Sequence, residues 1–189
     1  MIDDSENWIL SLYRTSEIAG SLFFGRLAKS MKPGPIQRDM TKHFADEAMH
    51  SWYWSSCVQE VGGTLIKIKE AYQEQYLAAV GLPANLMEVL AITQVFEKRV
   101  IHQYQLHSQS AMVHPAVQKT LATIMIDEKW HIRWIHDALK TMEPEYGPDL
   151  IQATLTRYWE ADQLVYEKTI TEHAERVHYL AAKSGGRMA

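Results

Sequence analysis

The stretch Asp127-Glu128-Lys129-Trp130-His131 carries the strongest structural signal in the chain, and residues 46–50 repeat its pattern. Each stretch is an Asp followed by Glu-x-x-His. On a helix, residues three apart lie on one face, so each stretch presents a carboxylate and an imidazole side by side. One such motif is weak, because Glu and His are common on solvated helix faces. Two copies with the same preceding Asp are far more specific.

Two further glutamates extend the pattern. Glu17 precedes Glu47 by 30 residues and Glu97 precedes Glu128 by 31, so the order Glu, Glu-x-x-His occurs twice. Glu17 and Glu97 lie among apolar residues at helical spacing, where an unpaired carboxylate would be costly or take up a proton. Two divalent cations would neutralise four such groups, and a mixed oxygen and nitrogen set suits iron or manganese. The pattern predicts a dinuclear metal site with six ligands: Glu17, Glu47, His50, Glu97, Glu128 and His131.

The aspartates before the two motifs are candidates for a supporting role. A carboxylate bonded to the distal N–H of a ligating histidine fixes the orientation of the ring. The similarity of the two halves predicts that Asp127 pairs with His50 and Asp46 with His131, across the molecule. The alternative is that each Asp lies on the surface beside residues of its own helix.

The chain between these motifs has helical periodicity and no strand alternation. We expect a first helix with Ser5 as its N-cap, ending before the prolines of residues 33–35. A second helix with Phe44 on its inner face ends at Gly62, a third begins near Leu86, and a fourth begins at Pro115.

The remaining segments complete the expected fold. Residues 64–81 are expected to form a moderately helical connection, long enough for the second and third helices to lie parallel. A last helix runs from Asp149 towards Leu180. The fold class is therefore all-α: a four-helix bundle with a long crossover between helices 2 and 3 and a long C-terminal fifth helix. We expect one domain over residues 1–189, with the bundle in 1–142 and the C-terminal helix in 147–182.

Composition excludes several classes of protein. The formal charge of −4 gives no basic face for nucleic acid, and Cys57, the one cysteine, allows no disulfide and no Cys-x-x-Cys site. No apolar run reaches the roughly 18 residues of a membrane span, and the acidic start does not resemble a signal peptide. We expect a cytoplasmic protein without a membrane partner.

From Tyr13 to about Leu139 the chain resembles the ferritin-like superfamily of di-iron carboxylate proteins. The resemblance implies two iron ions per chain, with manganese as the alternative. It implies that Glu17 and Glu97 are terminal ligands and that each histidine binds one ion. The glutamates of the two Glu-x-x-His motifs, Glu47 and Glu128, would bridge the ions.

Within the superfamily, mineral-storing ferritins usually keep one Glu-x-x-His and have a short fifth helix. Bacterioferritins share the symmetric ligands but place a haem-binding Met where this chain has Ala48, and rubrerythrins add a cysteine-rich module. The pattern is most similar to the small bacterial aldehyde-deformylating oxygenase type. That resemblance implies an oxidase or oxygenase that uses O₂ on a small organic substrate, with an electron donor such as a ferredoxin.

Residues near the ligands are further candidates. Tyr13 and Thr93 lie four residues before Glu17 and Glu97, within reach of the metal level, and are the catalytic candidates. Tyr13 is either a redox-active or hydrogen-bonding phenol or a tyrosine bonded to a carbonyl group. Gly20 leaves room for O₂ or a slim substrate, or allows close helix packing. For His43, one turn before Glu47, we expect a partly exposed side chain.

Other functions fit the same ligands. The chain could bind, store or detoxify iron as bacterioferritins do, or hold a di-manganese catalase-like site, or use metal only structurally. The apolar side of the last helix needs a cover, which predicts a homodimer.

Overall fold

The computed structural model of the chain describes residues 2–69, 72–110, 113–173 and 176. All regular secondary structure in this part of the chain is helical, which confirms the all-α prediction. The helices are α1 (Asp4–Ser30), α2 (Pro35–Glu60), α3 (Tyr72–Val80), α4 (Leu86–Ser108), α5 (Pro115–Thr141), α6 (Glu143–Tyr146) and α7 (Pro148–Glu172). The predicted continuation of the last helix towards Leu180 lies outside the described residues.

Local chemistry explains most helix ends. Asp3 caps α1 by accepting a hydrogen bond from the Glu6 backbone N–H at 2.8 Å. The predicted cap Ser5 was wrong, because the chain is already helical from Asp4, one residue before it. Asn85 caps α4 in the same way, and Gly62, at φ +73°, follows the end of α2 in a conformation that favours glycine.

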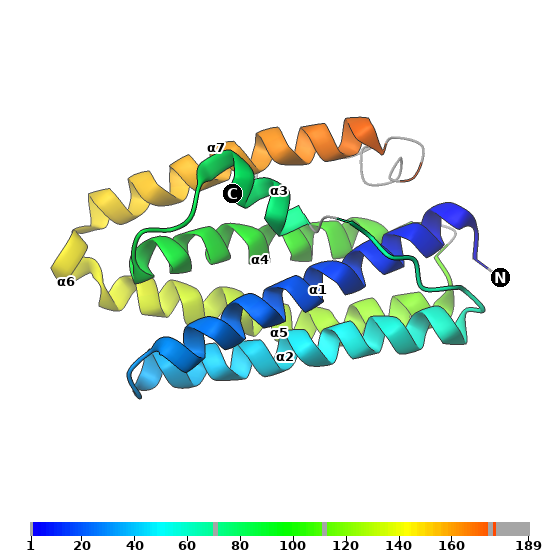
Figure 1. Ribbon diagram of the computed structural model, residues 1–189, viewed down its shortest axis with the longest axis horizontal. Helices are drawn as coiled ribbons and strands as arrows, with labels where there is room; N and C mark the ends of the chain where they lie inside the picture. The colour runs from blue at the N-terminus through cyan, green and yellow to red at the C-terminus, as the bar shows by residue number, and fades with distance from the viewer. Residues whose placement is uncertain (1, 70–71, 111–112, 174–175, 177–189) are drawn as a thin grey trace.

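Four long helices lie side by side. α1 packs on α2, α2 on α5 and α5 on α4, while α7 packs on the outer side of α4. Figure 1 shows α1 and α2 running in opposite directions, as α4 and α5 do, and α2 and α4 running in the same direction. Within the described residues no helix is both long and apolar enough to span a lipid bilayer.

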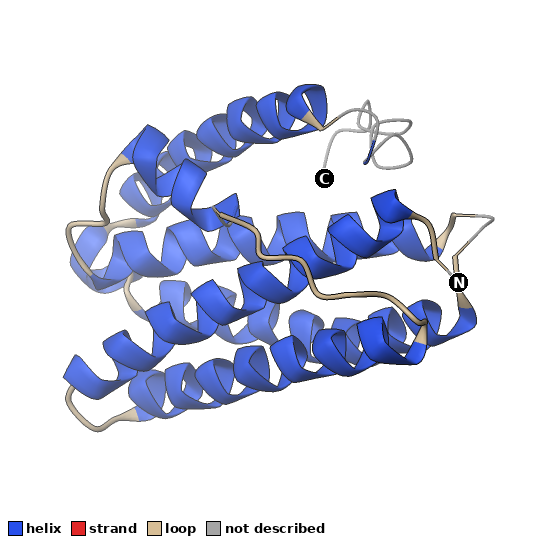
Figure 2. Ribbon diagram, turned by 45° about the vertical axis from the view of Figure 1, so that its right-hand side comes forward, coloured by secondary structure: helices blue, strands red, loops and turns tan. Residues whose placement is uncertain are grey.

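The connection between α2 and α4 differs from the prediction. Among the described residues of this connection only Tyr72–Val80 are helical, and residues 64–69 cross the outside of α1 without helical structure (Figure 2). The amide of Asn7 bonds both the N–H and the carbonyl of Thr64, at 2.9 and 2.8 Å. Ile66 and Ile68 are half-buried against α1 while the residues between and beside them are exposed. This two-residue alternation is typical of an extended segment, and the prediction missed it.

Two apolar clusters fill the interior, one towards each end of the long helices. Trp54, Tyr104 and Ile124 belong to the first, and Phe24 and Ile135 to the second. The repeated glutamates described above lie between the two clusters, since Glu17 separates Tyr13 from Phe24 along α1.

Candidate metal centre

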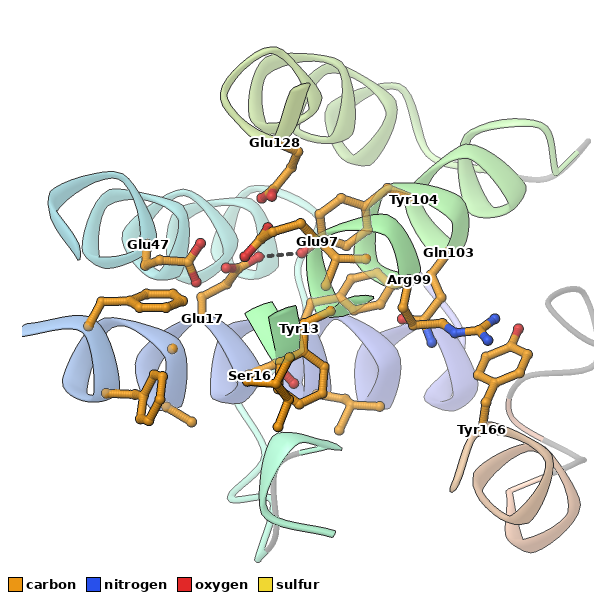
Figure 3. A pocket seen from close by; sticks show the side chains of 18 of the residues that line it. Tyr13, Ser16, Glu17, Glu47, Glu97, Arg99, Gln103, Tyr104, Glu128 and Tyr166 are labelled. Atoms are coloured by element: carbon orange, nitrogen blue, oxygen red, sulfur yellow. Dashed lines mark hydrogen bonds between the residues drawn. The ribbon is translucent and has the colours of Figure 1, made fainter. Parts of the chain in front are cut away.

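The fold brings the six predicted ligands together between the two apolar clusters. Each long helix contributes at the same level, so the carboxylates of the four glutamates point towards one another (Figure 3). No ligand residue is more than 5% exposed. The residues are Glu17 from α1, Glu47 and His50 from α2, Glu97 from α4, and Glu128 and His131 from α5.

The donor atoms form two groups that share Glu47. One group is Glu17, Glu47, His50 and Glu128, the other His43, Glu47, Glu97 and His131, and in each the ligand atoms lie within 4.8 Å of one another. Glu128 spans both groups as well: its Oε1 lies 3.3 Å from His50 Nδ1 and its Oε2 lies 3.1 Å from His131 Nδ1. A pair of carboxylates that reach both groups is the geometry needed to bridge two ions.

Each motif histidine is held from behind by an aspartate of the opposite helix. His50 Nε2 lies 3.3 Å from Asp127 Oδ2, and His131 Nε2 lies 3.2 Å from Asp46 Oδ2. These are the cross-molecule pairs expected from the sequence. A proton on Nε2 that is donated to Asp leaves the Nδ1 lone pair facing the glutamates, which is the tautomer a metal requires. Asp46 also pairs with Lys42 on its own helix.

The electrostatics of the centre call for positive charge. Burial raises the pKa of Glu47 well above its usual value, and the carboxylates of Glu17 and Glu97 raise it further. Burial and the nearby Glu128 carboxylate raise the pKa of Glu97 to about 8. Burial opposes protonation of His50, but the nearby carboxylates of Glu128 and Glu17 outweigh it and raise the histidine pKa to about 12. Protons therefore compensate the carboxylates until cations displace them.

Several buried donor atoms at the centre fit a metal better than they fit one another. His50 Nδ1, Glu128 Oε1 and both ring nitrogens of His43 make no hydrogen bond, although all are shielded from solvent. Buried polar atoms without partners are costly and uncommon. Lone pairs directed at a common space account for His50 Nδ1, Glu128 Oε1 and His43 Nε2, and so the residues present fit a pair of divalent cations.

His43 is the main residue that the sequence interpretation misplaced. The predicted partly exposed side chain is wrong, because His43 is 0% exposed and lies against the centre. The cause is a shift of one position: Phe44, expected on the inner face of α2, is 37% exposed instead. The steps from Met40 to His43, Glu47 and His50 are three, four and three residues, as on one face of a helix. This spacing predicts the inward position of His43.

Tyr104 is a second residue at the centre without a predicted role. Its hydroxyl donates to Glu17 Oε1 (Figure 3). Trp54 Nε1 donates to the same hydroxyl at 3.2 Å. Tyr104 follows Glu97 by seven residues, two helical turns, so it lies on the same face of α4. A hydrogen bond of this kind orients the terminal carboxylate of one half only.

The two catalytic candidates lie near the centre in different settings. Tyr13 is buried, with its ring edge-to-face against Tyr104 at 4.8 Å and tilted against Trp54 at 5.2 Å. Thr93 is also buried, but its hydroxyl donates to the Val89 carbonyl one turn back on α4 at 2.8 Å. Its single proton is therefore used within the helix, and its oxygen can only accept a hydrogen bond at the centre.

A cavity of about 320 Å³ leads to the carboxylates between α1, α4 and α7. Glu17, Glu47, Glu97 and Glu128 close its inner end (Figure 3). Its walls are mainly apolar, with Leu12, Leu22, Phe23, Ile92, Phe96, Val100 and Ile170 among them.

Gly20 forms part of the cavity wall where it meets the centre. A Cβ atom on this residue would lie 2.5 Å from Glu47 Oε2. The absence of a side chain therefore makes room for a ligand carboxylate, a more specific role than the two predicted alternatives.

Comparison with known proteins returns no match to any family model, curated protein or solved structure. The geometry of the centre and the cavity is therefore the basis for a functional proposal.

Proposed function

We propose that the chain is a ferritin-like di-iron oxidase or oxygenase that activates O₂ and acts on a small organic substrate. The observation that carries the proposal is a buried set of four glutamates and two motif histidines at the inner end of an apolar cavity. The antiparallel pairs α1–α2 and α4–α5, each with one Glu and one Glu-x-x-His, support the ferritin-like four-helix bundle.

In this proposal Glu47 and Glu128 would help to hold both ions, because each reaches both groups of donors. Glu17 and His50 complete one ion, while Glu97 and His131 complete the other. The bound iron would supply the redox chemistry that reduces O₂. Asp46 and Asp127 hold the histidine rings in place.

The surroundings define what else the protein contributes. Apolar walls exclude water from the carboxylates and favour an apolar organic substrate over a polar one. Tyr104 holds a proton on its hydroxyl beside Glu17, since burial and the Glu17 and Glu128 carboxylates keep its pKa well above the usual value. That proton is available for hydrogen bonding at one side of the centre only.

The cavity lining favours this function over iron storage or detoxification. Apart from the four ligand glutamates, the cavity is lined by no acidic side chain among the described residues, whereas Arg26 and Arg99 do line it. A route for Fe(II) would need carboxylates along its length. Arg26 opposes entry of a cation, whereas the charge of Arg99 is balanced by its ion pair with the buried Asp162. A manganese catalase-like enzyme uses small polar peroxide and has no need of an apolar cavity.

Iron retention tests the proposal. Apo-protein is given excess Fe(II) in air, desalted and assayed for iron, with Glu128→Ala as the control without a bridging ligand. About two ions per chain in the wild type are expected. Many ions per chain would identify a storage protein and overturn the proposal. Almost none, with manganese in the protein as purified, would favour the catalase-like alternative.

The predicted electron donor and homodimer are parts of the same proposal. Trp159 and Leu164 on α7 are 41% and 70% exposed, which supports a partner at this helix. Sedimentation of the purified protein measures the oligomeric state.

A further inference from the structure

His43 lies beside the centre without the interactions that a buried histidine normally has. Its ring is 0% exposed and stacks on His131, with ring centroids 3.7 Å apart, while Phe24 covers it at 4.0 Å. Nε2 lies 3.1 Å from Glu97 Oε1 and 3.3 Å from Glu47 Oε1, yet neither ring nitrogen forms a hydrogen bond. Close approach without hydrogen bonding means that these atoms are not directed at one another.

Shared coordination accounts for this arrangement. Ligand atoms at about 2.1 Å from one metal ion lie about 3 Å from their nearest neighbours in the same coordination sphere. His43 Nε2, Glu97 Oε1 and Glu47 Oε1 have such separations, and His131 Nδ1 lies 3.5 Å from Glu97 Oε2. A purely structural histidine in this position would leave Nε2 buried between two carboxylates without a partner, at a considerable cost, and a metal ion would satisfy that atom.

The other half of the centre has no counterpart of His43. Glu47 and Glu128 are 81 residues apart, as are His50 and His131, and the same offset takes His43 to Ile124. Ile124 is 0% exposed and belongs to the apolar cluster near Tyr104. The difference is therefore one nitrogen donor on one side and a hydrocarbon side chain on the other.

We propose that His43 is a seventh ligand, so that one ion is bound by two histidines and the other by one. The inference rests on the proposed function, in that the centre must hold two ions. Imidazole is a good ligand for iron and for later first-row metals, so the two-histidine side binds more tightly and fills first. The centre is then chemically asymmetric, although its six motif ligands are symmetric.

Metal titration of matched variants tests the proposal. His43→Ile gives both halves the same residue, and Ile124→His introduces a second histidine into the opposite half. Each protein is titrated anaerobically with ⁵⁷Fe(II) and followed by Mössbauer spectroscopy, and circular dichroism and thermal unfolding establish that the variants are folded. In the wild type the first equivalent should populate one quadrupole doublet and the second equivalent another.

In His43→Ile the tighter site should weaken by about tenfold or more, and one doublet should move while the other keeps its parameters. Ile124→His should move the opposite doublet and narrow the difference in affinity between the sites. These two results support ligation by His43.

If His43→Ile is folded and binds two ions with both doublets and both affinities unchanged, His43 is not a ligand although the dinuclear centre stands. If His43→Ile does not fold, unchanged filling order in Ile124→His overturns the proposal. A wild type that binds no iron overturns this proposal and the proposed function together.

Discussion

The α1–α2 and α4–α5 halves of the molecule share their ligands but differ in almost everything around them. Glu17 corresponds to Glu97 at an offset of 80 residues, and each helix pair carries one Glu-x-x-His. At that offset Tyr104, which donates to Glu17, corresponds to Phe24, which covers His43. Binding of two metal ions would require the two halves to have the same residues only at the ligand positions. The residues around the ligands can therefore differ between the halves.

The cavity shows the same division. Gly20 on α1 and Val100 on α4 are equivalent positions, and both line the cavity. Only Gly20 is close enough to restrict a ligand, because any side chain there would contact Glu47. The symmetric glutamates and histidines therefore form the candidate metal centre. Their asymmetric neighbours determine access to it and would set the environment of each ion.

The largest effect is expected from removal of a bridging carboxylate. Glu47→Ala and Glu128→Ala should each reduce retained metal from about two ions per chain to almost none, because each glutamate serves both groups of donors. Metal analysis after desalting makes the measurement. Glu160→Ala, on the exposed face of α7, is the matched control and should retain two ions. If either variant retains about two metal ions per chain, the replaced glutamate is not a ligand that both ions require.

Replacement of the outer aspartates should have a smaller effect and should compare the halves directly. Asp127→Asn acts on His50, and Asp46→Asn acts on His131. Each should lower metal affinity by about 10- to 100-fold, since the histidine loses the partner that orients it. Asp46 is the more buried of the two, with an 18% exposed side chain against 37% for Asp127, so its variant should be the weaker binder. Competition with a chelator of known affinity provides the values. Equal affinities for both variants and the wild type would remove the aspartates from the site.

Gly20→Ala should disturb the centre moderately. The new methyl group would overlap Glu47 Oε2, so the carboxylate must shift, with strain of about 1–3 kcal/mol. We expect roughly tenfold weaker metal binding, measured by titration with Fe(II) under anaerobic conditions. Val100→Ala, the equivalent change on α4, enlarges the cavity without contacting a carboxylate and should bind metal normally. If Gly20→Ala and Val100→Ala bind Fe(II) with the same affinity, the close contact between Gly20 and Glu47 has no effect on metal binding.

The pH dependence of the metal-free protein should give the smallest effect. Burial and Glu128 raise the pKa of Glu97 from 4.5 to about 8, so between these values the folded state holds a proton that the unfolded chain has lost. The folded state likewise retains a proton on His50 above pH 6.5, where burial is outweighed by Glu128 and Glu17. Both groups make the free energy of unfolding fall as pH rises from about 6.5 to about 8, by up to about 1.4 kcal/mol per pH unit for each proton.

Thermal unfolding of the apo-protein across this range measures that decline. Loading with metal should remove or reverse it, because cations displace the same protons and bind more tightly at higher pH. Glu97→Gln removes one of the two titrating groups and should flatten the apo-protein profile. A rising stability of the apo-protein with pH would contradict the assignment of protons to the centre.

Much of the fold could be predicted because the relevant signals are local. Prolines at the start of α2 and α5 and the glycine after α2 mark helix ends through their backbone chemistry. The extended conformation around Ile66 could also have been predicted from the alternation of buried and exposed residues. The alternation is short, and neighbouring residues with helical preference outweighed it. Its position depends on side chains of α1 that are more than 50 residues away in the chain, as with Asn7 and Thr64.

The sequence by itself determined that the chain is helical and that Glu17, Glu47, His50, Glu97, Glu128 and His131 recur at spacings suited to one shared level. A helix period and a ligand spacing are properties of short segments, and they can be read without knowing the neighbours. Only the tertiary structure decided that His43 faces inward, that Tyr104 bonds Glu17, and that an apolar cavity leads to the carboxylates. Those features depend on which helix faces meet and how closely α1 approaches α4, and no single helix carries that information.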